Sequence, residues 1–539
     1  MHPWWRGAVI YQIYPRSFRD SNGDGIGDLA GITEKLDYAR ALGVDAIWIS
    51  PFFKSPMKDF GYDVADYRAV DPIFGSNKDF DRLLEEAHAR GLKVVIDTVM
   101  AHTSDQHPWF AESRSSRDNP KADWYVWADA REDGSPPNNW ISTFGGSTWQ
   151  WYTRRSQYYL HHFLKEQPNL DWHNDEMVEA MLDEARYWLR KGVDGLRLDA
   201  ISTLVHDAEL RDNPPAPPEA GRVAVATERG SNFSMQLHIH DRDRPEIMAK
   251  FERLKDMMDE FPGAFTLGEI GEGGAIEAAA KYTNAERGLD TGYTFELTKP
   301  EFSWDLVHEV VGQVERLIDR GWKTYAFSNH DVVRAVTRWG ALPHLSGDRP
   351  ALAKLLLALI TSLRGSCCIY QGEELGLTEA DLAFEDIVDP PGIEFWPAYK
   401  GRDGCRTPFP WAHGQENAGF GAGRPWLPVP VEHLALAADL QEDDPASVLN
   451  FFRSWLAWRR QVPALIRGSL TLLEEPDPVV GFERATDEQR ILCLFNLSNE
   501  PASASIGSGW VPLEGHGFSD AADGDTVALP PFGVFFAER

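Results

Sequence analysis

The sequence predicts an α/β fold: a (β/α)8 TIM barrel with an inserted subdomain after strand 3 and a C-terminal all-β domain. Three observations support this prediction. A unit of helix end, glycine and short apolar strand recurs eight times, one interval between units is far longer than a helix needs, and short strands separated by turns replace the unit near residue 467. A doubly wound open sheet is the alternative, but it seldom contains eight similar units.

The eight predicted strands each follow a glycine. A glycine just past a helix adopts the left-handed conformation that ends the helix. The apolar run after it is typical of a parallel strand buried on both faces. Eight such units indicate a closed barrel, and the unit at Gly288 is the weakest. The glycines are Gly7, Gly43, Gly91, Gly192, Gly263, Gly288, Gly321 and Gly365.

The spacing of the units locates the insertions. From Gly91 to Gly192 the chain advances 101 positions, which predicts a small subdomain rich in Trp, Pro, Gly and Asn after strand 3. The sequence SLTLLEE and later alternating segments predict the β domain. The predicted divisions are the barrel at 1–103 and 173–466, the inserted subdomain at 104–172, a Pro-rich excursion at 211–230, a long loop at 377–445 after strand 8, a closing helix at 446–460 and the β domain at 467–539.

Composition excludes several classes of partner. The chain has 539 residues, 43% of them hydrophobic, and a net charge of −30. This charge repels nucleic-acid backbones and anionic lipids, so we expect no nucleic acid or membrane partner and a neutral small ligand instead. The longest apolar stretch, 355–360, is far shorter than the ~20 residues of a membrane span. Adjacent Cys367 and Cys368 point to opposite faces of a strand, so we expect reduced thiols and a cytoplasmic location without a signal peptide.

Acidic residues follow several predicted strands at the end where barrel enzymes carry their sites. Arg197 and Asp199 share one face of strand 4, Glu269 ends strand 5, and Asp331 follows strand 7. Carboxylates brought together separate their pKa values, as a retaining glycosidase requires of its acid and its nucleophile. A metal site of the enolase type is an alternative use of such acids, but Arg197 disfavours a cation beside Asp199.

Seven motifs occur in an order that resembles the α-amylase family, glycoside hydrolase family 13, within its oligo-1,6-glucosidase and α-glucosidase subfamily. The resemblance covers essentially the whole chain. It implies Asp199 as nucleophile, Glu269 as general acid/base and Asp331 as stabiliser of the transition state. The motifs are YQIYPRSF at 11–18, GYDVADY at 61–67, QPNLDW at 167–172, GLRLDA at 195–200, GE at 268–269, NHD at 329–331 and GRDGCRTPFPW at 401–411.

The same resemblance implies a substrate pocket that closes around one terminal sugar. Groups that bind the non-reducing end block that end, so we expect an exo-acting enzyme. The implied residues are Asp59 and Arg402 at the non-reducing end, Tyr62 beneath the sugar ring, His102 and His330 on its hydroxyls, Arg197 keeping Asp199 ionised, and Phe144 and Phe163 in the wall.

Ala200 bears on the linkage. Subfamily members that prefer α-1,6 bonds carry Val after the nucleophile, so Ala200 favours α-1,4 substrates such as maltose. An oligo-1,6-glucosidase, a sucrose-acting glucosidase or isomerase, and an endo-amylase are alternatives, and a non-catalytic barrel subunit is a remote one. An alcohol or sugar acceptor that replaces water would give transglucosylation. We expect no organic cofactor, and the sequence does not predict the oligomeric state.

One loop near the N-terminus is a candidate metal site. Its oxygen-bearing residues alternate as at the start of an EF-hand, but Gly31 stands where the twelfth-position Glu would be, so it is not an EF-hand. A plain turn is the alternative, and the resemblance implies structural Ca2+ or Mg2+. The calcium ligand of related amylases before the strand-3 histidine is replaced by Ala101, so we expect no ion there. We expect His238 and His240 within the helix after strand 4. The candidate ligands are Asp20, Asn22, Asp24, Ile26 and Asp28.

Overall fold

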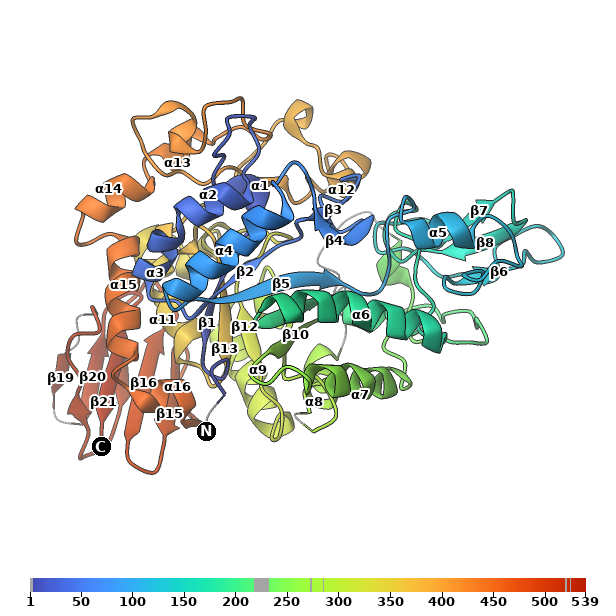
Figure 1. The fold of residues 1–539 in the computed structure, drawn as a ribbon. Helices are drawn as coiled ribbons and strands as arrows, with labels where there is room; N and C mark the ends of the chain where they lie inside the picture. The colour runs from blue at the N-terminus through green and yellow to red at the C-terminus, as the bar shows by residue number, and fades with distance from the viewer. Residues whose placement is uncertain (1–2, 218–231, 272–273, 285, 519–520, 524) are drawn as a thin grey trace.

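Eight parallel strands form the core of the molecule, shown by a computed structural model that describes residues 3–217, 232–271, 274–284, 286–518, 521–523 and 525–539 (Figure 1). Their order in the sheet is β11-β10-β9-β5-β2-β1-β13-β12, and a parallel bridge between Gly292 and Lys323 joins its two edges. The predicted (β/α)8 barrel is therefore confirmed. The strands are β1 (Val9–Ile13), β2 (Ala46–Ile49), β5 (Lys93–Val99), β9 (Gly195–Asp199), β10 (Phe265–Ile270), β11 (Thr291–Thr294), β12 (Thr324–Ala326) and β13 (Ser366–Tyr370).

Each barrel strand begins within three residues of its predicted glycine. The physical reason differs along the chain. Gly192 ends its helix in the left-handed conformation, with φ of 104°. Gly288 and Gly321 have no positive φ, but a Cβ there would lie 2.2 Å from the Tyr282 carbonyl oxygen and 2.1 Å from that of Thr283. At these two positions glycine is required because two backbone segments approach closely, and not because a left-handed residue ends a helix.

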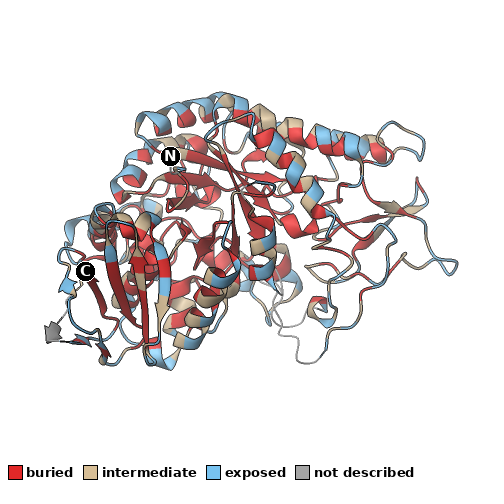
Figure 2. Ribbon diagram, turned by 90° about the horizontal axis from the view of Figure 1, so that it is seen from below, coloured by how far each residue is buried: buried red, intermediate tan, exposed pale blue. Residues whose placement is uncertain are grey.

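Helices surround the barrel, with exposed outer faces and buried strands inside (Figure 2). The helix predicted to close the barrel is α15 (Val448–Arg459), which contacts α11 and α3. Within the described residues, no helix has the length and apolar character needed to cross a bilayer. The other main helices are α2 (Leu29–Glu34), α3 (Leu36–Leu42), α4 (Asn77–Ala89), α6 (Asp175–Lys191), α7 (Ile247–Met258), α8 (Ala275–Tyr282), α9 (Trp304–Leu317) and α11 (Arg349–Ser362).

Between β5 and α6 the chain leaves the barrel and forms a small projecting unit (Figure 1). It contains α5 (Pro108–Ser113) and a sheet of β6 (Trp127–Ala128), β8 (Gln157–Leu160) and β7 (Trp149–Tyr152), all inside the range predicted for the inserted subdomain. This unit has a small hydrophobic core of its own, which includes Trp140. Most of the predicted Pro-rich excursion, 218–230, lies outside the described residues.

The C-terminal region is all-β, as predicted. One antiparallel sheet contains β14 (Ser469–Leu473), β15 (Val479–Ala485), β16 (Arg490–Asn496), β21 (Val534–Glu538) and β18 (Val511–Pro512). A second sheet of β17 (Ala502–Ser505), β20 (Thr526–Leu529) and β19 (Ala521–Asp523) was not identified from the sequence, because its strands are only three or four residues long. The first sheet packs against α9, where the Trp304 indole donates to the Val479 carbonyl at 2.8 Å.

Candidate active site

A single pocket at the C-terminal ends of the barrel strands contains most of the predicted site residues. The space inside it, including the part open to solvent, is about 920 Å³. The inserted subdomain forms one wall, and the loop after β9 forms another. The predicted residues that line it are Asp59, Tyr62, His102, Phe144, Phe163, Asp199, Glu269, Asp331 and Arg402, whereas Arg197 and His330 lie behind it.

The guanidinium of Arg197 connects three carboxylates from neighbouring strands. Its Nη1 lies 2.8 Å from Asp97 Oδ1 on β5 and 2.7 Å from Asp199 Oδ1, and its Nη2 lies 2.7 Å from Glu269 Oε2 on β10. The Arg197 side chain is fully buried, so its charge depends on these partners. The backbone N–H of Ala200 also donates to Glu269 Oε2 at 3.1 Å. The sequence pattern Arg-x-Asp thus places a cation and a carboxylate on the same inward face.

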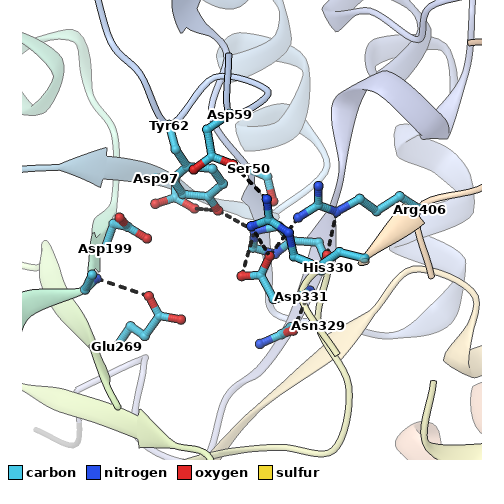
Figure 3. A network of polar contacts seen from close by, with 12 residues as sticks. Ser50, Asp59, Tyr62, Asp97, Asp199, Glu269, Asn329, His330, Asp331 and Arg406 are labelled. Atoms are coloured by element: carbon cyan, nitrogen blue, oxygen red, sulfur yellow. Dashed lines mark hydrogen bonds and ion pairs between the residues drawn. The ribbon is translucent and has the colours of Figure 1, made fainter. Parts of the chain in front are cut away.

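The environment separates the pKa values of the two acids that face each other in Figure 3. Burial raises the pKa of Glu269 to about 7 against the Arg197 charge, and the negative charges of Asp199 and Asp331 add to this. Burial raises the pKa of Asp199 to about 6, and Arg197 and a hydrogen bond with Glu269 oppose the rise. The neighbouring negative charges favour the protonated form of Glu269, and the Arg197 guanidinium favours the ionised form of Asp199, which are the states that an acid and a nucleophile need.

Two arginines from the long loop after β13 keep Asp331 ionised. Arg406 Nη2 lies 2.7 Å from Asp331 Oδ1, and Figure 3 shows these two side chains. Arg402 Nη1 lies 3.2 Å from the same oxygen. Burial alone would raise the pKa of Asp331, but His330, Arg402 and Arg406 hold it well below its usual range. Asp331 is therefore a fixed negative charge in the pocket wall.

Arg402 also binds Asp59, at the end of the pocket where the resemblance places the non-reducing sugar. Its Nη2 lies 2.8 Å from Asp59 Oδ1 and 2.6 Å from Asp389 Oδ1. Gln167 from the inserted subdomain donates to Asp59 Oδ2 at 3.0 Å. The Arg402 guanidinium lies 5.3 Å from the centre of the Phe144 ring. These contacts join the long loop, the β2 side of the barrel and the inserted subdomain across one end of the pocket.

The aromatic wall comes from the inserted subdomain. The rings of Phe144 and Phe163 are edge-on with centroids 5.7 Å apart, and Phe163 lies 5.4 Å from His102. Burial lowers the pKa of His102 to about 4, so its ring is neutral near pH 7. A neutral imidazole and two apolar rings suit an uncharged ligand.

The structure places His330 differently from the expected contact with a sugar hydroxyl. Its ring is fully buried and stacks on Tyr62 at 5.4 Å. Its Nε2 lies 2.5 Å from the Tyr62 hydroxyl, and its Nδ1 lies 2.8 Å from Gln12 Nε2. Both ring nitrogens are engaged, so in this arrangement His330 supports Tyr62, and Tyr62 lines the pocket.

Tyr293 on β11 was not predicted. Its hydroxyl donates to Glu269 Oε1 at 3.0 Å and accepts from Arg197 Nη2 at 2.7 Å. The signal was present but weak, because the residue pairs with Glu269 in register on the strand after Gly288. Arg406 and Gln167 were also missed, although both belong to motifs quoted for the resemblance.

The predicted metal loop has a defined conformation. Asp20 Oδ1 accepts from the Gly23 backbone N–H at 2.6 Å, and its Oδ2 accepts from Gly25 at 3.0 Å. Asp28 caps α2 through the Gly31 N–H. In the described part of the chain, the three aspartates of the loop do not form a group with ligand atoms within 4.8 Å of one another. The aspartate oxygens of this loop could also bind an ion, so the structural Ca2+ or Mg2+ stays a prediction.

The expected helical position of His238 and His240 is wrong. Both lie in the loop before α7, which begins only at Ile247. Pro245 disfavours an earlier helix, because a proline inside a helix removes a hydrogen bond. His238 instead stacks on Phe233 at 3.9 Å, and its Nδ1 lies 2.7 Å from Asp241 Oδ2.

Comparison with known proteins gives consistent results. A sequence profile of the alpha-amylase catalytic domain matches residues 12–468. A "Probable alpha-glucosidase" of Rhizobium meliloti (strain 1021) is 52% identical and aligns over 99% of this chain and 97% of the relative, and an oligo-1,6-glucosidase of Heyndrickxia coagulans is 39% identical over 93% and 94%. The crystal structure of the alpha-glucosyl transfer enzyme XgtA has a TM-score of 0.97 at 54% identity, and that of the trehalulose synthase MutB from Pseudomonas mesoacidophila MX-45 has 0.88 at 33%. Each structural match covers 100% of both chains.

Proposed function

Because the chain belongs to the alpha-amylase family of glycoside hydrolases, we propose that it is a retaining exo-α-glucosidase that releases terminal α-linked glucose from short oligosaccharides. The observation that carries this proposal is the meeting of Asp199, Glu269 and Asp331 at one pocket, where the carboxylates beside Glu269 raise its pKa and Arg197 opposes the rise at Asp199.

The reaction uses Glu269 as the protonated group and Asp199 as the ionised one. Glu269 gives its proton to the glycosidic oxygen as Asp199 attacks the anomeric carbon, so the leaving sugar departs neutral and a glucosyl ester forms on Asp199. Glu269, now ionised, takes a proton from water as the water oxygen replaces Asp199. Two inversions retain the α configuration. The fixed charge of Asp331 is placed to stabilise the positive charge that develops on the sugar.

The contacts of Arg402 support the exo mode. At one end of the pocket, Arg402 forms ion pairs with Asp59 and Asp389, and Gln167 donates a hydrogen bond to Asp59. Asp59 and Arg402 both line the pocket. A polysaccharide that runs through the site would have to break these buried ion pairs. The proposal therefore favours short substrates over internal cleavage of starch.

Ala200 lines the pocket, and its side chain is a single methyl group. This small side chain, where α-1,6-preferring relatives are expected to carry Val, supports an α-1,4 preference. The names of the relatives span several linkages and both hydrolysis and transfer, so an α-1,6 or a sucrose-directed activity is the second candidate. Transglucosylation of an alcohol or sugar acceptor is part of the proposal, supported by the similarity to XgtA. A cytoplasmic location is proposed on the four unpaired, buried cysteines.

The test is a product analysis on maltose, isomaltose and sucrose, with and without an alcohol acceptor. We expect maltose to be cleaved fastest, and NMR at early times to show α-glucose before mutarotation. β-Glucose as first product would refute retention, and internal cleavage of starch would refute the exo mode. Faster turnover of isomaltose or sucrose would select the second candidate, and Ala200→Val is the matched variant for the linkage argument.

A further inference from the structure

Asp171, His173 and His206 form a cluster outside the pocket that the reaction above does not use. One potential ligand atom from each residue lies within 4.8 Å of the others, and in the described residues this is the one such group of histidine, cysteine, aspartate and glutamate. Asp171 and His173 belong to the segment that returns from the inserted subdomain to α6, and His206 belongs to the loop after β9. The cluster therefore joins two segments that are 33 positions apart in the chain, counted from His173 to His206.

The hydrogen bonds of His173 leave it ready to bind a cation. Its Nε2 lies 2.9 Å from the His206 carbonyl oxygen, which can only accept, so this nitrogen carries the proton. Nδ1 of the neutral ring is then the nitrogen with a free lone pair. Histidines that bind metals commonly donate their other N–H to a backbone carbonyl in this way. The His173 backbone N–H also orients Asp171, whose Oδ1 accepts it at 3.0 Å.

His206 is the buried member of the cluster. It is only 6% exposed, and one of its ring nitrogens is among the potential ligand atoms of the cluster. Its ring is edge-on to His173, with centroids 4.9 Å apart. It is also edge-on to the ring of Trp140 in the inserted subdomain, with centroids 6.2 Å apart.

We propose that Asp171, His173 and His206 bind a divalent transition-metal ion of the Zn2+, Co2+ or Ni2+ class. Two imidazoles and one carboxylate suit these ions better than Ca2+ or Mg2+, which prefer oxygen ligands. The net charge of −30 attracts cations to the molecule. Water would complete the coordination of the ion.

The bound ion would link the two walls of the substrate pocket. Ser202 and Thr203, which line the pocket, precede His206 on the same loop, and the inserted subdomain carries the opposite wall. The site is thus positioned to stabilise the junction between the subdomain and the barrel, and it does not depend on the proposed reaction.

The experiment uses the full chain, stripped with a chelator and kept in excess Ca2+ so that the loop at 20–28 does not take up the added metal. Zn2+ binding is measured by calorimetry and by the shift of the melting temperature, and Co2+ binding by its visible absorption. Wild type should bind one Zn2+ tightly, and His173→Gln should weaken this by at least about tenfold. His88→Gln is the matched control, because His88 is also a partly exposed histidine beside a carboxylate, Asp194, and among the described residues this pair belongs to no group of three potential ligands.

His206→Gln should weaken binding as much as His173→Gln, and if this buried substitution prevents folding, the variant at the exposed His173 decides alone. Absence of stoichiometric Zn2+ binding by wild type would overturn the proposal. So would equal affinities of wild type, His173→Gln and His88→Gln, because the ion would then lie elsewhere.

Discussion

Replacing Tyr293 with phenylalanine tests the assignment of the acid directly. The Tyr293 hydroxyl donates to Glu269 Oε1 at 3.0 Å and thereby favours the ionised form of that carboxyl. A hydrogen bond to a charged group contributes about 1.5–3 kcal/mol. Since one pKa unit corresponds to about 1.4 kcal/mol, its loss should raise the pKa of Glu269 by about one to two units. Arg197 Nη2 is already 2.7 Å from Glu269 Oε2, so it cannot compensate by moving closer.

The readout is the pH dependence of kcat/KM on maltose, whose leaving sugar needs protonation. The alkaline limb reports the pKa of the acid in the free enzyme. Glu269 must be protonated to act, so a higher pKa moves this limb from near 7 toward higher pH. An aryl α-glucoside with a good leaving group provides an internal comparison, because its cleavage depends less on the acid.

Tyr325→Phe is the matched control. Tyr325 lies on β12, is buried, and its hydroxyl has no hydrogen-bond partner in the described part of the chain. Its removal should leave the alkaline limb unchanged. If Tyr293→Phe also leaves that limb in place on maltose, Glu269 is not the acid whose ionisation limits the reaction, and the argument from the site geometry is wrong.

Three further predictions concern the nucleophile, the metal loop and the buried ion pairs. Asp199→Asn should lower kcat by about four orders of magnitude or more while circular dichroism stays native, and near-normal turnover would remove Asp199 from the mechanism. A chelator should lower the melting temperature without directly blocking turnover, because an ion at 100 times its Kd contributes about 2.7 kcal/mol. Ca2+ or Mg2+ should restore it, and Asp24→Asn should lose the response, whereas an unchanged melting temperature would indicate a plain turn. Arg402→Ala leaves buried Asp59 and Asp389 without this partner and should cost about 3–5 kcal/mol in urea unfolding, and a cost below 1 kcal/mol would contradict the role given to these pairs.

The barrel was predictable because its signal is local. A glycine followed by a buried apolar strand can be recognised within about ten residues, and all eight such units form strands. The second sheet of the C-terminal region lacks such a signal, since strands like β17 (Ala502–Ser505) depend on pairing with a partner more than twenty residues away. Local patterns therefore indicated the architecture, and long-range pairing determined the rest.

The site divides in the same way. Asp199 and Glu269 stand at strand ends and could be placed by counting from a glycine. The partnership of Arg406 with Asp331 spans 75 positions and depends on how the long loop folds back. The position of His330 behind Tyr62 likewise depends on contacts with Gln12 from β1. A motif identifies such a histidine, but only the packing shows what it touches.

The pairing of β1 with β13, in which Val9 stands opposite Cys367, has a consequence for biosynthesis. One flank of the first strand made stays without its neighbour until the last barrel strand leaves the ribosome. At ~5–20 residues per second this interval is roughly 20 to 70 s. During that time the nascent chain exposes an open strand edge, a hazard for aggregation. Synthesis speed and chaperone supply should therefore influence the yield of active protein.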